Sequence, residues 1–183
     1  MSKDLDWQLI AGLGNPDKEY DNTYHNAGFL AVDYLTRERA AGTNFKRLKD
    51  FEYCRLGKAR GIVFLKPRGF MNESGRAVKA AAGYFKIGPE RILIIHDDSD
   101  IKLGDYKLSF GRNSAGHKGV QSVIEALKTK NFWRLRLGIR KESGVKAERF
   151  VLQKMTPGDK SIFEKNLAEI RSLYFEAQRE IER

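Results

Sequence analysis

The segment RILIIHDD at residues 91–98 says most about the architecture of this chain. Its apolar residues run without interruption from Ile92 to Ile95, and a histidine and two aspartates follow directly. An unbroken apolar run of this length is typical of a strand that is buried on both faces of a sheet. We therefore expect a central strand over residues 91–95 that ends at His96, with Asp97 at its carboxyl end.

Strands and helices are predicted to alternate on both sides of this segment. Continuous or alternating apolar residues predict strands, and apolar residues at helical spacing predict helices. The expected strands cover residues 7–13, 51–56, 62–65, 106–110 and 133–139, and the expected helices cover 27–40, 74–85 and 120–127. The chain of 183 residues therefore reads as a single α/β domain over 1–183, a three-layer sandwich around a mixed, twisted sheet. Ligands of such sheets gather at the carboxyl ends of strands.

The last predicted element is a helix that begins after Thr156. Threonine is a good helix cap, and Pro157 suits the first helical position. Apolar residues then recur every three or four positions and form one stripe, at Phe163, Leu167, Ile170, Tyr174, Ala177 and Ile181. We expect this stripe to pack on the core, while a dimer interface or a mobile lid stays open as an alternative.

The positive charge is concentrated in one part of the chain. The net charge is +10, and residues 101–150 alone contain twelve basic and four acidic residues, a net charge of +8. A solvated basic face and a polyanion-binding surface both have this composition, and the concentration into one segment favours nucleic acid. The chain has no apolar run of 18 residues and no signal-like start, so we expect a cytoplasmic protein without a membrane partner.

Several common catalytic sites are excluded by their missing motifs. Residues 12–17, GLGNPD, lack the third glycine of a dinucleotide-binding loop, and the chain contains neither a GxxxxGK[ST] loop nor a GxSxG elbow. Cys54 is the only cysteine, which excludes an internal disulfide and a cysteine-based zinc cage, and its strand-like surroundings favour packing over nucleophilic attack. Water therefore remains as the attacking group.

Water needs a base that is neutral near pH 7, and the chain offers three histidines for this role. His25 lies in a polar loop before a predicted helix, whereas His96 ends a buried strand and is expected to be a core histidine. The spacing of these residues and His117 matches no local metal motif, so we expect no metal and no cofactor. Asp97 could orient a histidine and stabilise its protonated form.

Three asparagines complete the candidate site. Asn15, Asn26 and Asn72 could each be an ordinary turn or capping residue. Taken together they suit a neutral ester substrate, because amides can hold a peptide carbonyl and a water molecule without adding charge.

The motifs resemble, in order, those of bacterial peptidyl-tRNA hydrolases over about residues 9–155. The matching stretches are LGNP at 13–16 with Tyr20, HNAG at 25–28, KP at 66–67 leading into FMNESG at 70–75, HDDSD at 96–100, AGHKG at 115–119 and FWRLRLGI at 132–139. The resemblance implies a monomeric α/β enzyme that cleaves the ester between a peptide and the terminal ribose of tRNA, without metal or cofactor.

The resemblance also implies roles for individual residues. His25 would be the general base, Asp97 its orienting carboxylate, and Asn15 and Asn72 the groups that hold the peptide backbone and the water. His117 and Arg136 would line the RNA side. The full set of implied substrate-binding and tRNA-binding residues is Tyr20, Asn26, Phe70, Met71, Asn72, Lys107, His117, Lys118 and Arg136.

Three departures from the family pattern concern the RNA side. Lys118 stands where the family usually has asparagine, Ser109 stands where a second basic residue often follows Lys107, and the chain ends at Arg183, short of the usual tail. We expect Lys118 to act on RNA affinity rather than on the ester. Two alternatives are a catalytically silent RNA-binding protein on the same scaffold and a hydrolase of small acylated metabolites. The intact catalytic positions argue against the first, and the basic segment argues against the second.

Overall fold

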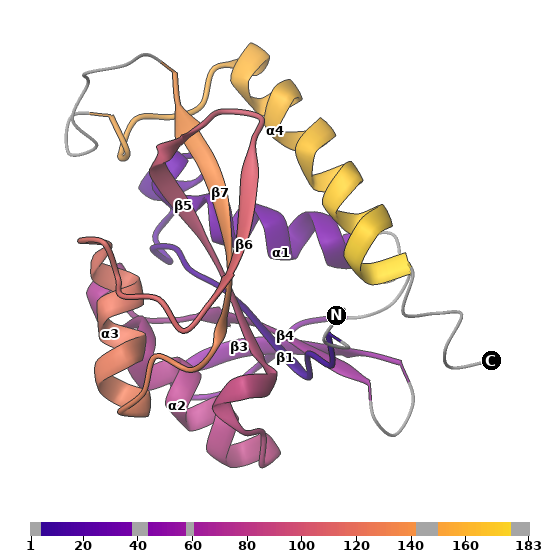
Figure 1. The fold of residues 1–183 in the computed structure, drawn as a ribbon, viewed down its shortest axis with the longest axis vertical. Coiled ribbons are helices and arrows are strands. Elements are labelled where there is room, and N and C mark those ends of the chain that lie inside the picture. Colours follow the sequence, from indigo (N-terminus) through magenta and orange to yellow (C-terminus); the bar gives the residue numbers. More distant parts are fainter. Residues whose placement is uncertain (1–4, 38–43, 58–60, 142–149, 177–183) are drawn as a thin grey trace.

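The computed structural model describes residues 5–37, 44–57, 61–141 and 150–176. Seven strands form one sheet in the order β2-β3-β4-β1-β5-β7-β6 (Figure 1). Their bounds are Leu9–Gly12 for β1, Lys46–Arg47 for β2, Phe51–Leu56 for β3, Ile62–Pro67 for β4, Ile92–Lys102 for β5, Tyr106–Phe110 for β6 and Trp133–Arg140 for β7. The pairs β1–β4, β1–β5 and β5–β7 are parallel and the other three pairs are antiparallel, so the predicted mixed sheet is confirmed.

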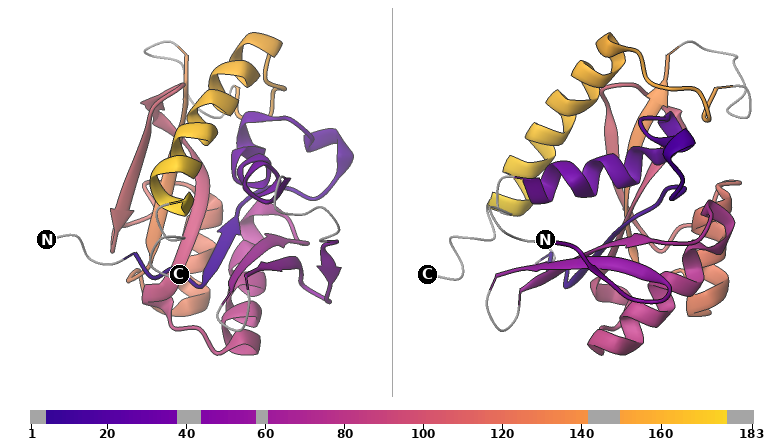
Figure 2. Two further views of the ribbon diagram at one scale, coloured as in Figure 1. Left: turned by 90° about the vertical axis from the view of Figure 1, so that its right-hand side faces the viewer. Right: turned by 180° about the vertical axis from the view of Figure 1, so that it is seen from behind.

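Helices cover both faces of this sheet (Figure 2). Their bounds are Ala27–Arg37 for α1, Ser74–Phe85 for α2, Lys118–Leu127 for α3 and Pro157–Ile170 for α4. One core cluster joins alternate residues of the central strands to α1 and α4, and the other joins the remaining residues to α2 and α3. Leu93 and Ile95 of β5 thus face α1, whereas Ile92 and Ile94 face α2. This confirms the three-layer α/β arrangement.

Strand β5 is longer than the sequence predicts. It continues past His96 to Lys102, because β7 pairs with it through Asp98 and again at Lys102 after a register shift. Its other neighbour, β1, pairs only as far as Ile95. Asp97 therefore lies within a strand rather than at its end. At Asp97, the edge of β5 on the side of β1 is no longer paired with β1.

Other boundaries differ by a few residues for local reasons. Helix α3 begins at Lys118, two residues earlier than predicted, because the His117 side chain caps it by accepting a hydrogen bond from the Val120 amide. Strand β2 was not predicted, since its two exposed residues have no periodicity. The expected helix over 27–40 is described to Arg37, and residues 38–40 lie outside the described part.

The C-terminal helix begins where the capping residue predicts. Thr156 accepts a hydrogen bond from the Asp159 amide, and Phe163, Leu167 and Ile170 are buried in the core cluster beside α1. The π-helix Arg171–Glu176 follows directly, and the remaining predicted stripe residues lie outside the side chains that the structure describes. Among the described helices, none has the length and apolar character needed to cross a membrane.

Candidate active site

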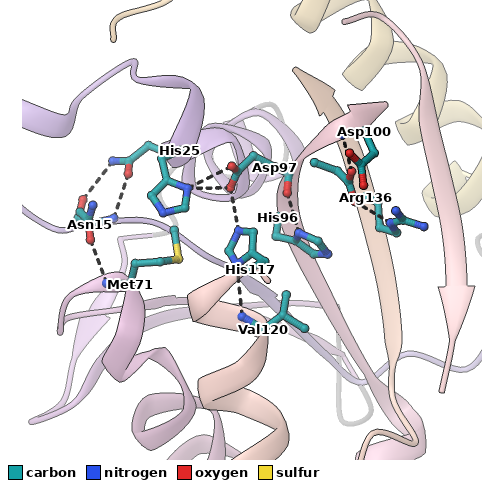
Figure 3. A network of polar contacts seen from close by, with 11 residues as sticks. Asn15, His25, Met71, His96, Asp97, Asp100, His117, Val120 and Arg136 are labelled. Carbon is teal, nitrogen blue, oxygen red and sulfur yellow. Dashed lines mark hydrogen bonds and ion pairs between the residues drawn. The ribbon is translucent and has the colours of Figure 1, made fainter. Parts of the chain in front are cut away.

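His25 reaches the sheet because a glycine lets two backbones come together. It lies in the 3₁₀ turn η2, Tyr24–Asn26, directly before α1. A Cβ atom at Gly28 would lie 2.3 Å from the Ile95 carbonyl oxygen and 2.3 Å from the Leu13 nitrogen. Only glycine permits this contact, so the start of α1 sits on the open edge of β5 and places His25 beside Asp97 (Figure 3).

Asp97 holds two histidines at once. Nδ1 of His25 lies 3.0 Å from both carboxylate oxygens, and Nε2 of His117 lies 2.9 Å from Oδ1. The Asp97 side chain is 5% exposed, His117 10% and His25 17%. The expected pairing of His25 with Asp97 is thus present as a contact, and His117, which was predicted to line the RNA side, belongs to the same network.

The hydrogen bonds define the tautomers of both rings. Nδ1 of His117 accepts from the Val120 amide, so its Nε2–H donates to Asp97. His25 must donate from Nδ1 to the same carboxylate, which leaves the lone pair on Nε2 available. Among the described residues, no hydrogen bond to Nε2 of His25 is present.

Opposing effects act on the pKa values of Asp97 and His25. Burial disfavours the ionised Asp97, but the electrostatic interaction with His117 and the hydrogen bonds from both histidines outweigh it and hold the pKa of Asp97 well below its usual range. Burial likewise opposes protonation of His25, but the hydrogen bond and charge of Asp97 raise the pKa of His25 above 6.5, while Lys118 lowers it. The arrangement therefore stabilises a proton on His25 once it has been taken up.

His96 plays no direct part in this site. It is 1% exposed, and its Nδ1 lies 2.7 Å from the carbonyl oxygen of Asp97. Its Nε2 has no hydrogen-bond partner among the described residues. Burial, and next the charge of His117, hold the pKa of His96 well below 6.5, so it is a neutral core histidine as predicted.

Asn26 positions Asn15 through both ends of its side chain. Its Oδ1 accepts from the Asn15 amide at 2.8 Å, and its Nδ2 donates to the Asn15 carbonyl at 3.0 Å. Both ends of the side chain are thus used within the protein and the residue is 3% exposed, and a substrate contact by Asn26 stays a prediction. Oδ1 of Asn15 accepts from the Met71 amide at 2.8 Å, which leaves Nδ2 of Asn15 as a donor without a described partner.

Met71 holds the start of α3 next to the candidate site. The residue is 5% exposed, and a Cβ atom at Gly119 would lie 2.4 Å from its Sδ atom. The first turn of α3 therefore packs directly on the 3₁₀ turn η3, Met71–Glu73. This contact brings Lys118 and Asn72, both exposed, to the same cavity of about 410 Å³.

The remaining predicted binding residues form two groups, each with one exposed and one partly buried member. Tyr20 and the 47% exposed Phe70 make an edge-to-face pair with ring centroids 6.5 Å apart. Lys107 and Arg136 are opposite one another on β6 and β7, and Arg136 forms an ion pair with Asp98 at 2.7 Å. Figure 3 shows Arg136 on the far side of His96 and Asp97 from His25, away from the ester site.

Sequence reasoning missed a segment that holds η2, the turn that contains His25. The His25 amide donates to the Val151 carbonyl at 2.8 Å, and the Tyr24 amide donates to the Gln153 carbonyl at 3.2 Å. The Tyr24 hydroxyl donates to Asp159 at the start of α4 at 2.5 Å. The helix-capping pattern at residues 156–159 was the one sequence signal near Asp159. The backbone hydrogen bonds of Tyr24 and His25 could not be predicted, because they do not depend on the side chains involved.

The same three groups could also approach a metal ion. One ligand atom each from His25, Asp97 and His117 lies within 4.8 Å of the others, although the sequence spacing predicts no such cluster. Both histidine nitrogens point at the carboxylate at hydrogen-bond distance, and a bound ion would have to replace both protons. In this structure the three groups form a hydrogen-bonded network.

Comparisons with known proteins identify a family for this chain. The family model described as peptidyl-tRNA hydrolase matches residues 9–180. A peptidyl-tRNA hydrolase of Lactobacillus delbrueckii subsp. bulgaricus is 39% identical over 165 residues, 89% of this chain and 88% of that protein. The protein of the same description from Aquifex aeolicus is 38% identical and covers 86% of this chain and 83% of its own length.

Solved structures give the same result. A crystal structure of the peptidyl-tRNA hydrolase of Acinetobacter baumannii superposes with a TM-score of 0.83 at 30% identity, covering 94% of this chain and 90% of that one. A crystal structure of a peptidyl-tRNA hydrolase in complex with N-propanol superposes with a TM-score of 0.80 at 32% identity, covering 90% and 84%.

Proposed function

This chain belongs to the peptidyl-tRNA hydrolase family, and we propose that it cleaves the ester of peptidyl-tRNA with His25 as the general base. The observation that carries this assignment is the hydrogen bond from Nδ1 of His25 to Asp97, which leaves Nε2 as a proton acceptor. A base that is oriented by a buried carboxylate is the arrangement by which several unrelated hydrolases activate a nucleophile.

The proposed hydrolysis uses Nε2 of His25, which has no hydrogen-bond partner among the described residues. Nε2 of His25 takes a proton from water, and the hydroxide oxygen attacks the ester carbon to form a tetrahedral intermediate. The intermediate collapses when the bond to the ribose oxygen breaks, and the protonated His25 returns its proton to that oxygen. The second histidine, His117, keeps Asp97 in place throughout.

The asparagines take different parts in this step. The side-chain oxygen of Asn15 already accepts from the Met71 amide, so Asn15 can offer a substrate only its Nδ2 donor. A donor suits the carbonyl oxygen on which negative charge develops. Asn72 follows Met71 directly and is exposed, so it can bind the peptide backbone or the water. Asn26 acts through Asn15 and touches no reacting atom.

The tRNA is proposed to approach over β6, β7 and the first turn of α3. Lys107, Lys118 and Arg136 belong to the segment with a net charge of +8, and phosphate contacts from such residues position RNA. The monomeric state and the cytoplasmic location remain predictions.

The test uses purified protein with N-acetyl-aminoacyl-tRNA and with the same tRNA carrying an unblocked amino acid. We expect free tRNA to be released from the blocked substrate and much less from the unblocked one, because the neutral amides of Asn15 and Asn72 suit a peptide carbonyl and not a free ammonium. Release should be unchanged in EDTA. Binding without release would favour the silent RNA-binding alternative, and loss in EDTA with recovery in zinc would overturn a metal-free mechanism.

A further inference from the structure

The backbone around η2 is paired with residues 151–155, which precede α4. Two amides of η2 donate to carbonyl oxygens of this segment, and the Met155 amide donates to the Asn22 carbonyl at 2.8 Å. An isolated antiparallel bridge joins Thr23 to Lys154 between these bonds. The position of η2 therefore depends on how this segment and the turn are themselves anchored.

One side chain of η2 reaches the rigid body of α4. Tyr24 is buried, and its ring packs edge-to-face on Phe150 with the ring centroids 5.7 Å apart. Its hydroxyl donates to Oδ2 of Asp159 in the first turn of α4 at 2.5 Å. Phe163 and Leu167 hold the same helix in the core, so the hydroxyl is bonded to a fixed point.

Asp159 joins three elements through one oxygen atom. Besides the Tyr24 hydroxyl, Oδ2 accepts from the Thr156 hydroxyl at 2.7 Å and from the Lys141 ammonium at 2.9 Å. Thr156 caps α4, and Lys141 directly follows β7. Hydrogen bonds to an ionised carboxylate are stronger than those between neutral groups, so this buried carboxylate is a firm anchor for η2.

The anchor lies one residue away from the proposed base. Because His25 directly follows Tyr24, a shift of the turn moves the imidazole relative to Asp97, which lies only 3.0 Å from Nδ1. The other charged or titratable groups near His25 are His117 and Lys118, and both belong to the start of α3. The contact between η2 and α4 therefore acts on His25 through its position.

We propose that Asp159 is a positioning residue for hydrolysis, because through the Tyr24 hydroxyl it holds η2 where the His25 imidazole meets Asp97. The proposal rests on the proposed function, in which His25 is the general base. The Tyr24 hydroxyl and the Asp159 carboxylate are engaged with each other, so we expect neither to contact the substrate.

The experiment compares Tyr24→Phe, Asp159→Ala and the double variant with the unmodified full-length protein. The matched control is Tyr106→Phe, since the Tyr106 hydroxyl also donates to a carboxylate of α4, that of Glu169 at 3.1 Å, but Tyr106 belongs to β6. Circular dichroism confirms folding. The first measurement is the release of tRNA from N-acetyl-aminoacyl-tRNA, in single turnover over a range of pH and in steady state.

The second measurement requires no activity. The pKa of the His25 imidazole is followed by NMR in the free protein, and its signal is assigned by its loss in His25→Ala. Because Asp97 raises the pKa of His25 above 6.5, a looser turn should bring it back toward that value. A purely structural role of Asp159 would leave this pKa unchanged in a folded variant.

We expect Tyr24→Phe to lower the single-turnover rate at saturation about tenfold, with KM unchanged. This is less than the loss of a whole base, because a misplaced base retains part of its effect. Asp159→Ala should cause a similar loss, and the double variant should be no slower than Asp159→Ala, because both changes remove one contact. In both single variants the pKa of His25 should fall, and Tyr106→Phe should keep the normal rate and pKa.

Other results would contradict the proposal. A folded Tyr24→Phe with a normal rate and a normal His25 pKa would show that the anchor does not position the base. A raised KM with an unmoved pKa would place the pair in substrate binding, and multiplicative losses in the double variant would mean that Asp159 does not act through Tyr24. All three results leave the proposed function intact. If the unmodified protein released no tRNA, the proposed function would fail, and the NMR titration would still decide whether Asp159 positions His25.

Discussion

At the level of single residues, His25 is the proposed general base. We expect His25→Ala to lower turnover by a factor of about 10² to 10⁴, the usual contribution of a positioned base. The fold should survive, because the backbone amide of residue 25 keeps its bond to the Val151 carbonyl. Single-turnover release of tRNA measures the loss, with circular dichroism as the control for folding. A folded variant with near-normal turnover would remove His25 from the mechanism.

Asp97 should act through His25 and not independently. An asparagine at position 97 has one acceptor oxygen where the carboxylate receives donors from both His25 and His117. Asp97→Asn should therefore slow the same step, and combining it with His25→Ala should cost much less than the product of the two losses. Fully multiplicative losses in single-turnover assays would refute a coupled pair.

The pH dependence of the reaction should reflect the neighbours of His25. The base must be neutral to accept a proton, and its pKa is raised above 6.5 because Asp97 outweighs the effect of burial. Single-turnover rates should therefore fall as the pH decreases through a midpoint above 6.5. In Asp97→Asn this acid limb should move to lower pH, since burial then dominates. An unmoved midpoint would mean that another group controls it.

At the level of elements, the contact between η2 and α4 holds the catalytic turn in place. The Tyr24 hydroxyl donates to Asp159, which also accepts from Thr156 at 2.7 Å and Lys141 at 2.9 Å. We expect Tyr24→Phe to lower the free energy of unfolding by about 1–2 kcal/mol, measured in urea. Tyr53→Phe is the control, because that hydroxyl has no described hydrogen bond.

The same contact should weaken in acid. Burial favours the neutral Asp159, but the hydrogen bonds from Tyr24, Thr156 and Lys141 lower its pKa to about 2. A lowered carboxyl pKa stabilises the fold above the unfolded value of about 3.9 and stops doing so as the pH falls through the folded value. The difference between Tyr24→Phe and the unmodified protein should therefore shrink between about pH 4 and pH 2. A constant difference would show that the carboxylate charge is not involved.

At the level of the whole molecule, the uneven distribution of charge should govern tRNA binding. Of the net charge of +10, residues 101–150 carry +8, and this segment includes β6, α3 and β7. Affinity for tRNA should fall linearly with salt on logarithmic axes, by a slope of roughly −0.7 to −0.9 for each phosphate contact. The single-turnover rate at saturation should change little. A rate that fell with salt as steeply as the affinity would mean that the charges act on the chemistry.

Much of the architecture could be predicted from local patterns. The apolar run at residues 92–95, the helical spacing of 74–85 and the cap at Thr156 reflect burial and hydrogen bonding that act over a few residues. The extension of β5 to Lys102 could not be read in this way, because the polar residues after Ile95 stay in the strand only through pairing with β7.

The candidate site was likewise predictable only in part from local sequence. Its residue types were available from the sequence, because the proposed activation of water calls for a histidine, a carboxylate and amides. The sharing of Asp97 between two histidines, the use of both ends of Asn26 on Asn15, and the support of His25 by Val151 were decided only by the tertiary structure. These partners lie 11 to 126 residues apart, His25 and Val151 being the most distant, and a hydrogen bond forms only when the packed backbones bring its two atoms within about 3 Å.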